Sequence, residues 1–123
     1  MTRRVLIVDD EPDIRLLIRI NLVAAGYEVL EAGNGREAID FLEGQEPDLV
    51  LLDLRLPELD GWEVLEHLKE RGVAERVPVI AISAHASPTT KERAREVGFK
   101  SYVSKPFTPE ELLEVVAQYA PLP

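Results

Sequence analysis

The chain has 123 residues, of which 46% are hydrophobic and 30% are charged, the balance of one globular domain with a single core. Its formal net charge of −9 argues against direct binding to nucleic acid, and it contains no apolar run near the ~18 residues that span a membrane. It has no cysteine, which excludes disulfide bonds and thiolate metal sites and fits a cytoplasmic location. We expect residues 1–120 to form one domain and residues 121–123 to be a tail or the start of a linker.

Short apolar runs alternate with amphipathic segments along the chain. The apolar runs are typical of buried strands in a parallel sheet, and the segments between them repeat apolar residues with helical spacing. In chain order we predict a strand at 5–8, a helix at 12–25, a strand at 28–31, a helix at 35–43, a strand at 49–52, a helix at 61–71, a strand at 79–82, a helix at 88–97, a strand at 101–103, and a last helix that Thr108 caps and Pro109 begins.

Two of these helices differ in how much apolar surface they offer. In the helix at 12–25, Ile14, Leu17 and Ile18 are expected to form the inner stripe. The helix at 88–97 is almost entirely polar, so it has little to bury and should be weakly anchored.

This alternation predicts an α/β fold of the flavodoxin-like, doubly wound kind. Five strand–helix pairs are too few for an eight-fold barrel, and an open parallel sheet with five helices on both faces is the natural solution. Strand order 2-1-3-4-5 places the most apolar strands centrally and the half-polar strand at 28–31 at an edge. The topological switch point then lies between the strands at 5–8 and 49–52, where ligands bind in such sheets.

Acidic residues follow both strands at this switch point. Asp9 and Asp10 follow the strand at 5–8, and Asp53 follows the strand at 49–52. Neighbouring carboxylates repel one another, so keeping them ionised requires a cation, and oxygen ligands suit Mg²⁺. The alternative is that these residues only cap the following helices. Because capping does not account for all three, we predict a metal site.

Two further strands end in groups that suit phosphoryl chemistry. Asp53 can act as a nucleophile that forms an acyl phosphate, with the Lys105 ammonium neutralising the incoming oxygens. The Ser83 hydroxyl can bond a phosphoryl oxygen. Pro106 biases Lys105 toward an extended conformation and allows a cis peptide bond. The alternatives are a turn serine and a solvated surface lysine.

At this point the chain resembles the receiver domain of bacterial two-component response regulators, a family that includes the chemotaxis switch protein. The resemblance covers essentially the whole chain. It is carried by four segments in the family's order and spacing, namely VLIVDDE at 5–11, LLDLRLPELDG at 51–61, PVIAISA at 78–84 and YVSKPF at 102–107.

The resemblance implies a role for each residue of the acidic cluster. Asp53 would be the phosphoacceptor, supplied by a phosphohistidine or a small phosphodonor. Asp10 would bind Mg²⁺ directly, Asp9 mainly through water, and the backbone carbonyl of Arg55 would be a further ligand. Mn²⁺ is an alternative ion. The domain would catalyse only its own phosphorylation and dephosphorylation.

The resemblance also implies a switch. Ser83 and Lys105 would contact the phosphoryl group, and Tyr102 would be an aromatic switch that turns as Ser83 moves. The chain departs from the family at Phe99, where a smaller residue is usual, so local packing should differ. Arg55 and the nearby His85 occupy variable positions that tune dephosphorylation, in a direction that the sequence does not give.

The implied partners are a sensor histidine kinase or phosphotransfer protein and a downstream protein or fused output domain, without direct contact to nucleic acid or membrane. The implied contact face combines the helix at 88–97, the strand at 101–103 and the last helix, and it would also serve a phosphorylation-dependent homodimer. Two other functions stay open, a small Mg²⁺-dependent aspartyl-nucleophile phosphatase and a binding module that works without phosphorylation. The sequence leaves open whether this is a single-domain regulator or part of a longer one.

Overall fold

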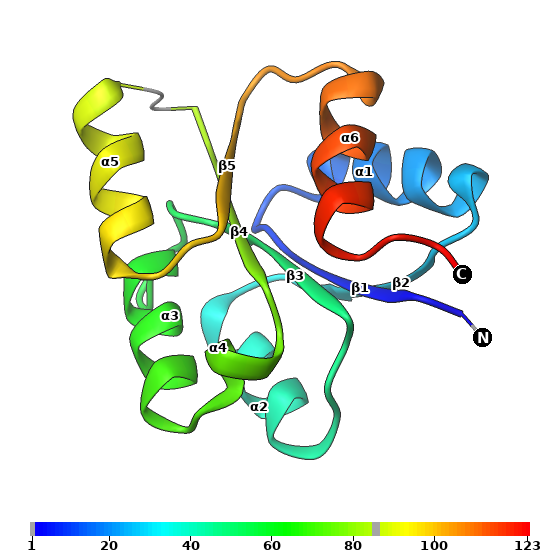
Figure 1. The fold of residues 1–123 in the computed structure, drawn as a ribbon. Helices are drawn as coiled ribbons and strands as arrows, with labels where there is room; N and C mark the ends of the chain where they lie inside the picture. The colour runs from blue at the N-terminus through cyan, green and yellow to red at the C-terminus, as the bar shows by residue number, and fades with distance from the viewer. Residues whose placement is uncertain (1, 85–86) are drawn as a thin grey trace.

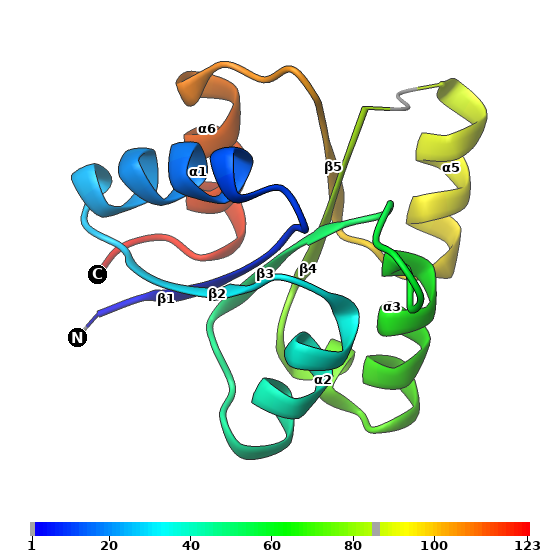
Figure 2. The same cartoon turned by 180° about the vertical axis from the view of Figure 1, so that it is seen from behind.

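The computed structural model describes residues 2–84 and 87–123, and its five strands form one parallel sheet with helices on both sides (Figure 1, Figure 2). The strand order is β2-β1-β3-β4-β5, with every neighbouring pair parallel, which confirms the predicted topology. Within the described residues, no helix is long and apolar enough to cross a membrane. The elements are β1 (Arg4–Val8), α1 (Pro12–Ala25), β2 (Glu28–Ala32), α2 (Gly35–Gly44), β3 (Leu49–Asp53), α3 (Gly61–Glu70), α4 (Val73–Arg76), β4 (Val79–Ser83), α5 (Pro88–Val97), β5 (Ser101–Ser104) and α6 (Pro109–Tyr119).

The predicted boundaries agree with these within one residue, but the prediction of five helices is wrong. In the described part of the chain a sixth helix, α4, makes a single turn between α3 and β4. Gly72 precedes it in the left-handed conformation, with φ of 74°, and Val73 and Val77 are buried at its two ends. Four residues are too few to show a helical repeat of apolar side chains, so sequence periodicity does not reveal the turn.

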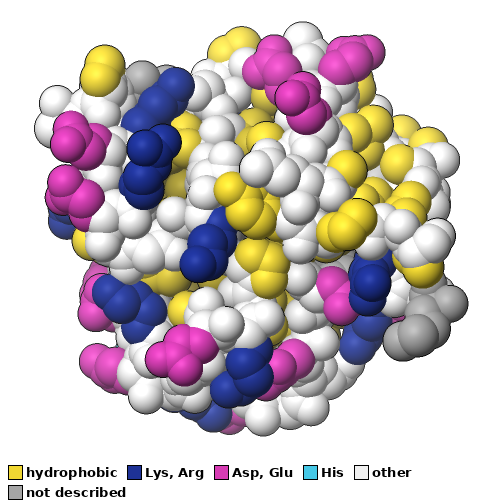
Figure 3. All heavy atoms as spheres, viewed as in Figure 1, with side chains coloured by type: hydrophobic (Ala, Val, Ile, Leu, Met, Phe, Trp, Pro, Cys, Tyr) yellow, Lys and Arg dark blue, Asp and Glu magenta, His cyan; other side chains and the backbone are white. Residues whose placement is uncertain are grey.

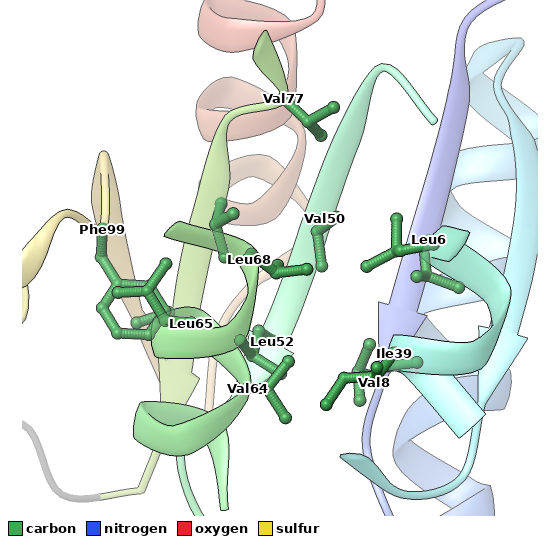
Figure 4. Packing of buried hydrophobic residues seen from close by; sticks show 14 of the residues in the cluster. Leu6, Val8, Ile39, Val50, Leu52, Val64, Leu65, Leu68, Val77 and Phe99 are labelled. Atoms are coloured by element: carbon green, nitrogen blue, oxygen red, sulfur yellow. The ribbon is translucent and has the colours of Figure 1, made fainter. Parts of the chain in front are cut away.

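The sheet separates two hydrophobic layers, because successive side chains of a strand point to opposite faces. Leu6 and Val8 of β1 belong to the layer under α2 and α3, whereas Val5 and Ile7 belong to the layer under α1 and α6. Figure 4 shows how closely the first layer packs, with Leu6, Val50, Leu65 and other labelled side chains converging between the strands and the helices. β1, β3 and β4 are buried on both faces, as the central position of their apolar runs predicts.

The prediction for the inner face of α1 is partly wrong. Ile18 and Leu22 are fully buried, but Leu17 is 45% exposed. Positions 18 and 22 are one turn apart and point at the sheet, whereas position 17 is rotated by about 100° from position 18 and by about 140° from position 22. Leu17 therefore joins an exposed apolar stripe, defined here as Leu16, Leu17, Ile20 and Val23.

α5 has fewer buried residues than the other long helices. Its one buried residue is Ala94, as its polar sequence predicts. The Arg93 guanidinium lies 4.4 Å from the centre of the Trp62 ring, and Trp62 packs edge-on against Phe99 with ring centres 5.7 Å apart. Phe99, the departure noted in the sequence, is therefore a buried support for α3 just beyond the end of α5.

Gly61 allows α3 to begin directly against the end of β3. Asp60 caps α3 and forms a capping box with Glu63, so the alternative in which Asp53 caps this helix is wrong. A Cβ atom on Gly61 would overlap the carbonyl oxygen of Asp53 and lie 2.7 Å from the Cα atom of Leu54. The absence of a side chain at this position therefore sets where Asp53 sits.

We expect Gly61→Ala to lower the free energy of unfolding by about 1–3 kcal/mol, because the added methyl group must displace backbone. Urea denaturation of both chains measures the difference. Gly44→Ala is the matched control, since a Cβ atom there meets nothing within 4 Å. It should change stability by less than about 1 kcal/mol, in the favourable direction. Equal effects of the two substitutions would contradict the close approach.

Candidate functional site

The predicted site residues meet at one edge of the sheet, where the carboxyl ends of the parallel strands lie. Asp9 follows β1, Asp53 ends β3, Ser83 ends β4 and Lys105 follows β5. Strand register brings them together, because Asp53 pairs with Ile82 in β4 and Ser83 pairs with Ser104 in β5. The four groups come from segments far apart in sequence and are adjacent only because of the strand order.

The acidic cluster consists of Asp9, Asp10, Glu11 and Asp53. Each offers one carboxylate oxygen, and these four atoms lie within 4.8 Å of one another. Asp9 and Asp53 are buried, at 1% and 2% exposure, whereas Asp10 and Glu11 are exposed. The cluster thus has two carboxylates shielded from solvent and two at its solvent-exposed edge. Glu11 is the member that sequence reasoning missed, although its place directly after Asp10 was a usable signal.

Backbone amides hold both buried carboxylates in place. The amide of Glu11 donates to Asp9 Oδ1, and the amide of Arg55 donates to Asp53 Oδ1, each at 2.9 Å. The second contact places the Arg55 backbone beside the cluster, near enough for its carbonyl to be a candidate ligand. The N-cap residue of α1 is Glu11 and carries no side-chain cap bond, so the alternative in which Asp9 and Asp10 cap this helix is wrong.

Lys105 joins the two buried acids. Its Nζ donates to Asp9 Oδ2 at 2.8 Å and to Asp53 Oδ2 at 3.0 Å, and it lies 3.5 Å from Glu11 Oε1. The side chain is only 13% exposed, which excludes the solvated surface lysine. The Lys105–Pro106 peptide bond is cis, and the amide of Lys105 donates to the Ser83 carbonyl at 2.9 Å.

The two predicted switch residues lie on neighbouring strands. Ser83 is 2% exposed at the end of β4, in the floor of the site. Tyr102 is half-buried on β5, opposite Ala81, and the Lys91 ammonium of α5 lies 5.8 Å from the centre of its ring. Tyr102 thus links the sheet beside Ser83 to α5. His85 lies outside the described residues.

Burial and charge set the ionisation of the site. Burial raises the pKa of Asp53 from 3.8 to about 6, and the charge of Asp9 adds to the rise, against the opposing hydrogen bonds from Arg55 and Lys105. Burial alone would lower the pKa of Lys105, but the hydrogen bonds and charges of Asp9 and Asp53 outweigh it and raise that pKa. Lys105 therefore stays cationic, while Asp53 is ionised at neutral pH at an energetic cost.

The donor set fits a hard divalent cation. Every group that the cluster offers is an oxygen, from carboxylates or from the neighbouring Arg55 carbonyl. Mg²⁺ takes such ligands in small number and keeps several waters, which suits a site with an exposed rim. A cation there would offset the repulsion among acids that a single lysine leaves uncompensated.

We expect Asp53→Asn to raise the free energy of unfolding at pH 8, in a metal chelator, by about 1–3 kcal/mol, since one pKa unit is worth about 1.4 kcal/mol. The folded-state pKa lies above the unfolded value of 3.8, so the contribution of Asp53 is full below that value and is lost as the pH rises through about 6.

The gap between variant and native chain should therefore close below about pH 4 in urea denaturation curves recorded across the pH range. Asp40→Asn, at an exposed position of α2, is the control and should show no such gap. A gap that is independent of pH would contradict the raised pKa of Asp53.

Comparison with known proteins identifies the family of this chain. The response regulator receiver domain model matches residues 5–117. The chain is 38% identical over 119 residues to the polar-differentiation response regulator DivK of Brucella ovis, covering 97% of each chain. Its fold superimposes on the chemotaxis response regulator CheY4 of Vibrio cholerae with a TM-score of 0.90 at 30% identity, covering 97% of this chain and 99% of that one. The Francisella response regulator 1452 receiver domain gives a TM-score of 0.90 at 29% identity, with 96% of each chain covered. The chain therefore belongs to the response regulator receiver domains, the phosphorylation-activated switches of two-component signalling.

Proposed function

We propose that this receiver domain accepts a phosphoryl group on Asp53 from the phosphohistidine of a sensor histidine kinase or phosphotransfer protein. One observation carries the proposal, the buried Asp53 carboxylate held 3.0 Å from the Lys105 ammonium within an acidic cluster. A carboxylate in that position is a nucleophile with a cation already beside it. The proposed location is the cytoplasm, where kinases have access to ATP.

The chemistry follows from the residues around Asp53. A carboxylate oxygen of Asp53 forms a bond to phosphorus as the phosphorus–nitrogen bond breaks, and the histidine leaves as a neutral imidazole once its other nitrogen is protonated. Lys105 and the Ser83 hydroxyl bind the phosphoryl oxygens. Asp9, Asp10, Asp53 and the Arg55 carbonyl would hold Mg²⁺. When bound, Mg²⁺ supplies charge neutralisation for the transferring group.

The two other functions have less support. A phosphatase with an aspartyl nucleophile would use a second acid two residues after Asp53, but Arg55 stands there and its amide bonds to Asp53. A module that works without phosphorylation would have no use for a lysine tied to both buried acids. We therefore assign one activity to the domain, the catalysis of its own phosphorylation and dephosphorylation.

A surface for the phosphoryl donor lies beside the site. The donor must bring its histidine to Asp53, so its surface must touch the elements around the pocket. α1 begins there, directly after Glu11, and carries the exposed apolar stripe, of which Ile20 is 57% exposed. Apolar residues gathered on one helix face suit a packed protein contact. We assign this stripe to the donor.

The output face combines α5, β5 and α6. Figure 3 shows cationic side chains over α5 and acidic side chains over the start of α6. A hollow of about 290 Å³ is lined on the α5 side by Lys91 and Arg95. An adjoining hollow of about 280 Å³ is lined on the α6 side by Glu111 and Glu114. Opposite charges on one face suit a two-fold pairing of phosphorylated copies as well as a separate output partner.

The relay would run through Ser83 and Tyr102. A new phosphoryl group attracts the Ser83 hydroxyl, Tyr102 turns into the vacated space, and α5 follows because Lys91 packs on the Tyr102 ring. α5 is suited to move because Ala94 is its one buried residue.

The proposed function predicts that acetyl phosphate with Mg²⁺ adds one phosphoryl group to the native chain and none to Asp53→Asn, as measured by intact mass. Asp13→Asn is the matched control, because Asp13 lies at the same edge in the first turn of α1 but outside the cluster. It should label normally. Labelling of Asp53→Asn at the native rate would end the assignment of Asp53.

The same assay separates donor docking from chemistry. Ile20→Glu should label normally with acetyl phosphate but accept phosphoryl groups at least about tenfold more slowly from a histidine kinase that phosphorylates the native chain, because a buried charge costs contact energy. Equal rates with both donors would remove the apolar stripe from the docking surface.

The relay predicts faster amide hydrogen exchange in α5 than in α6, and a change in α5 on adding beryllium trifluoride with Mg²⁺ as a phosphoryl mimic. Exchange is measured by mass spectrometry, with Asp53→Asn as the control that should not respond. Slower exchange in α5 than in α6, without response to the mimic, would contradict the relay.

A further inference from the structure

Arg15 of α1 contacts the backbone of the acidic cluster, although it is not one of the cluster's acids or its lysine. Its Nη1 donates to the carbonyl oxygen of Asp9 at 2.6 Å. Its Nε donates to Glu31 Oε1 at 3.2 Å, on the edge strand β2. The side chain is 21% exposed, so the contact with Asp9 is partly shielded from water.

This contact holds the peptide bond between Asp9 and Asp10. In a strand, successive side chains point to opposite faces, so two adjacent acids reach one cluster only if the chain leaves strand geometry between them. The amide of Asp9 still donates to the carbonyl of Ala32, where β2 ends. The carbonyl of Asp9 instead accepts from Arg15. Arg15 therefore marks the point at which the chain turns Asp10 into the site.

Glu31 orients the guanidinium of Arg15. One carboxylate oxygen of Glu31 accepts from Arg15, and the other accepts from Arg19 Nη1 at 2.6 Å. Glu31 is itself partly shielded, with its side chain 28% exposed. Arg15 and Arg19 thus share one anchor, but the Asp9 carbonyl hydrogen-bonds to Arg15.

We propose that Arg15, oriented by Glu31, is a positioning residue that fixes the Asp9–Asp10 peptide and thereby holds the Asp10 carboxylate ready for the divalent cation. The inference rests on the proposed function, since it assumes a cation in the acidic cluster. It extends that function because Arg15 of α1 and Glu31 of the edge strand β2 would determine how tightly the cation binds. Groups that orient metal ligands in this way typically change affinity by 10–100-fold when removed.

The test compares Arg15→Met with Arg19→Met. Methionine keeps much of the aliphatic stem and loses the donors, and both substitutions remove one ion pair to Glu31. We expect Arg15→Met to weaken Mg²⁺ binding about tenfold in calorimetry, and Arg19→Met to stay within about twofold of native. Equal constants for Arg15→Met and the native chain, or equal losses in both variants, would overturn the proposal.

Two further measurements separate positioning from general damage. In metal-free protein, the backbone ¹⁵N resonance of Asp10 should shift in Arg15→Met and not in Arg19→Met, because that nitrogen shares the peptide whose carbonyl Arg15 binds. Labelling by acetyl phosphate should need more Mg²⁺ in Arg15→Met but reach a near-native rate at saturation, and Arg15→Lys should recover part of the affinity. An unchanged Asp10 resonance, or a lost rate at saturating Mg²⁺, would contradict positioning.

The outcomes also distinguish this inference from the proposed function. A native chain that binds no Mg²⁺ would refute the proposed metal site, whereas native binding that Arg15→Met leaves unchanged would refute only the role of Arg15. Arg15→Gln is the second variant if Arg15→Met does not fold. The same loss of Mg²⁺ affinity is expected for it.

Discussion

The Lys105 ammonium between the carboxylates of Asp9 and Asp53 is the interaction on which the rest of the site depends. Two buried acids side by side repel each other, and burial already favours the protonated form of Asp53. One cation shared between them makes the arrangement tolerable without removing the cost. The site is therefore held in a state that a divalent cation or a phosphoryl group can change.

In the proposed relay, this balance of charges is what couples phosphorylation at the site to a distant surface. The backbone of Lys105 is bonded to Ser83, so the lysine, the serine and the ends of β4 and β5 form one unit. Tyr102 lies on β5 with its ring beside Lys91 of α5, the long helix with the fewest buried residues. In the relay that we propose, this sheet edge and α5 act together as a two-state element, because a change in charge at one end would alter which packing is preferred at the other.

On the other side of the site, α1 and the edge strand β2 contact the backbone of the acidic cluster. Arg15 and Glu31 connect α1 and the edge of β2 to the backbone of Asp9. The half-polar character of β2 follows partly from its edge position and partly from this contact, since Glu31 is occupied by two arginines. α1 thus presents three faces, with Ile18 and Leu22 in the core, Arg15 toward the site, and the exposed apolar stripe that we assign to the phosphoryl donor.

Much of this was readable from the sequence, because a parallel sheet turns strand order into spatial proximity. Apolar runs that end in Asp9, Asp53, Ser83 and Lys105 were enough to predict the topology and to place these groups at one edge. Element boundaries also followed, since capping residues, prolines and glycines act locally.

Other features depended on tertiary packing. The one-turn helix α4 is too short for periodicity, and the exposure of Leu17 depends on how α1 rotates against the sheet. Glu11 joins the acidic cluster, and Arg15 reaches Asp9, only because the chain turns at the end of β1. The sequence by itself determined which groups stand at the strand ends, because periodicity and end signals are properties of neighbouring residues. Only the tertiary structure decided which long side chains connect these groups. Such contacts join atoms from different strands and helices, and their separation in the sequence does not predict them.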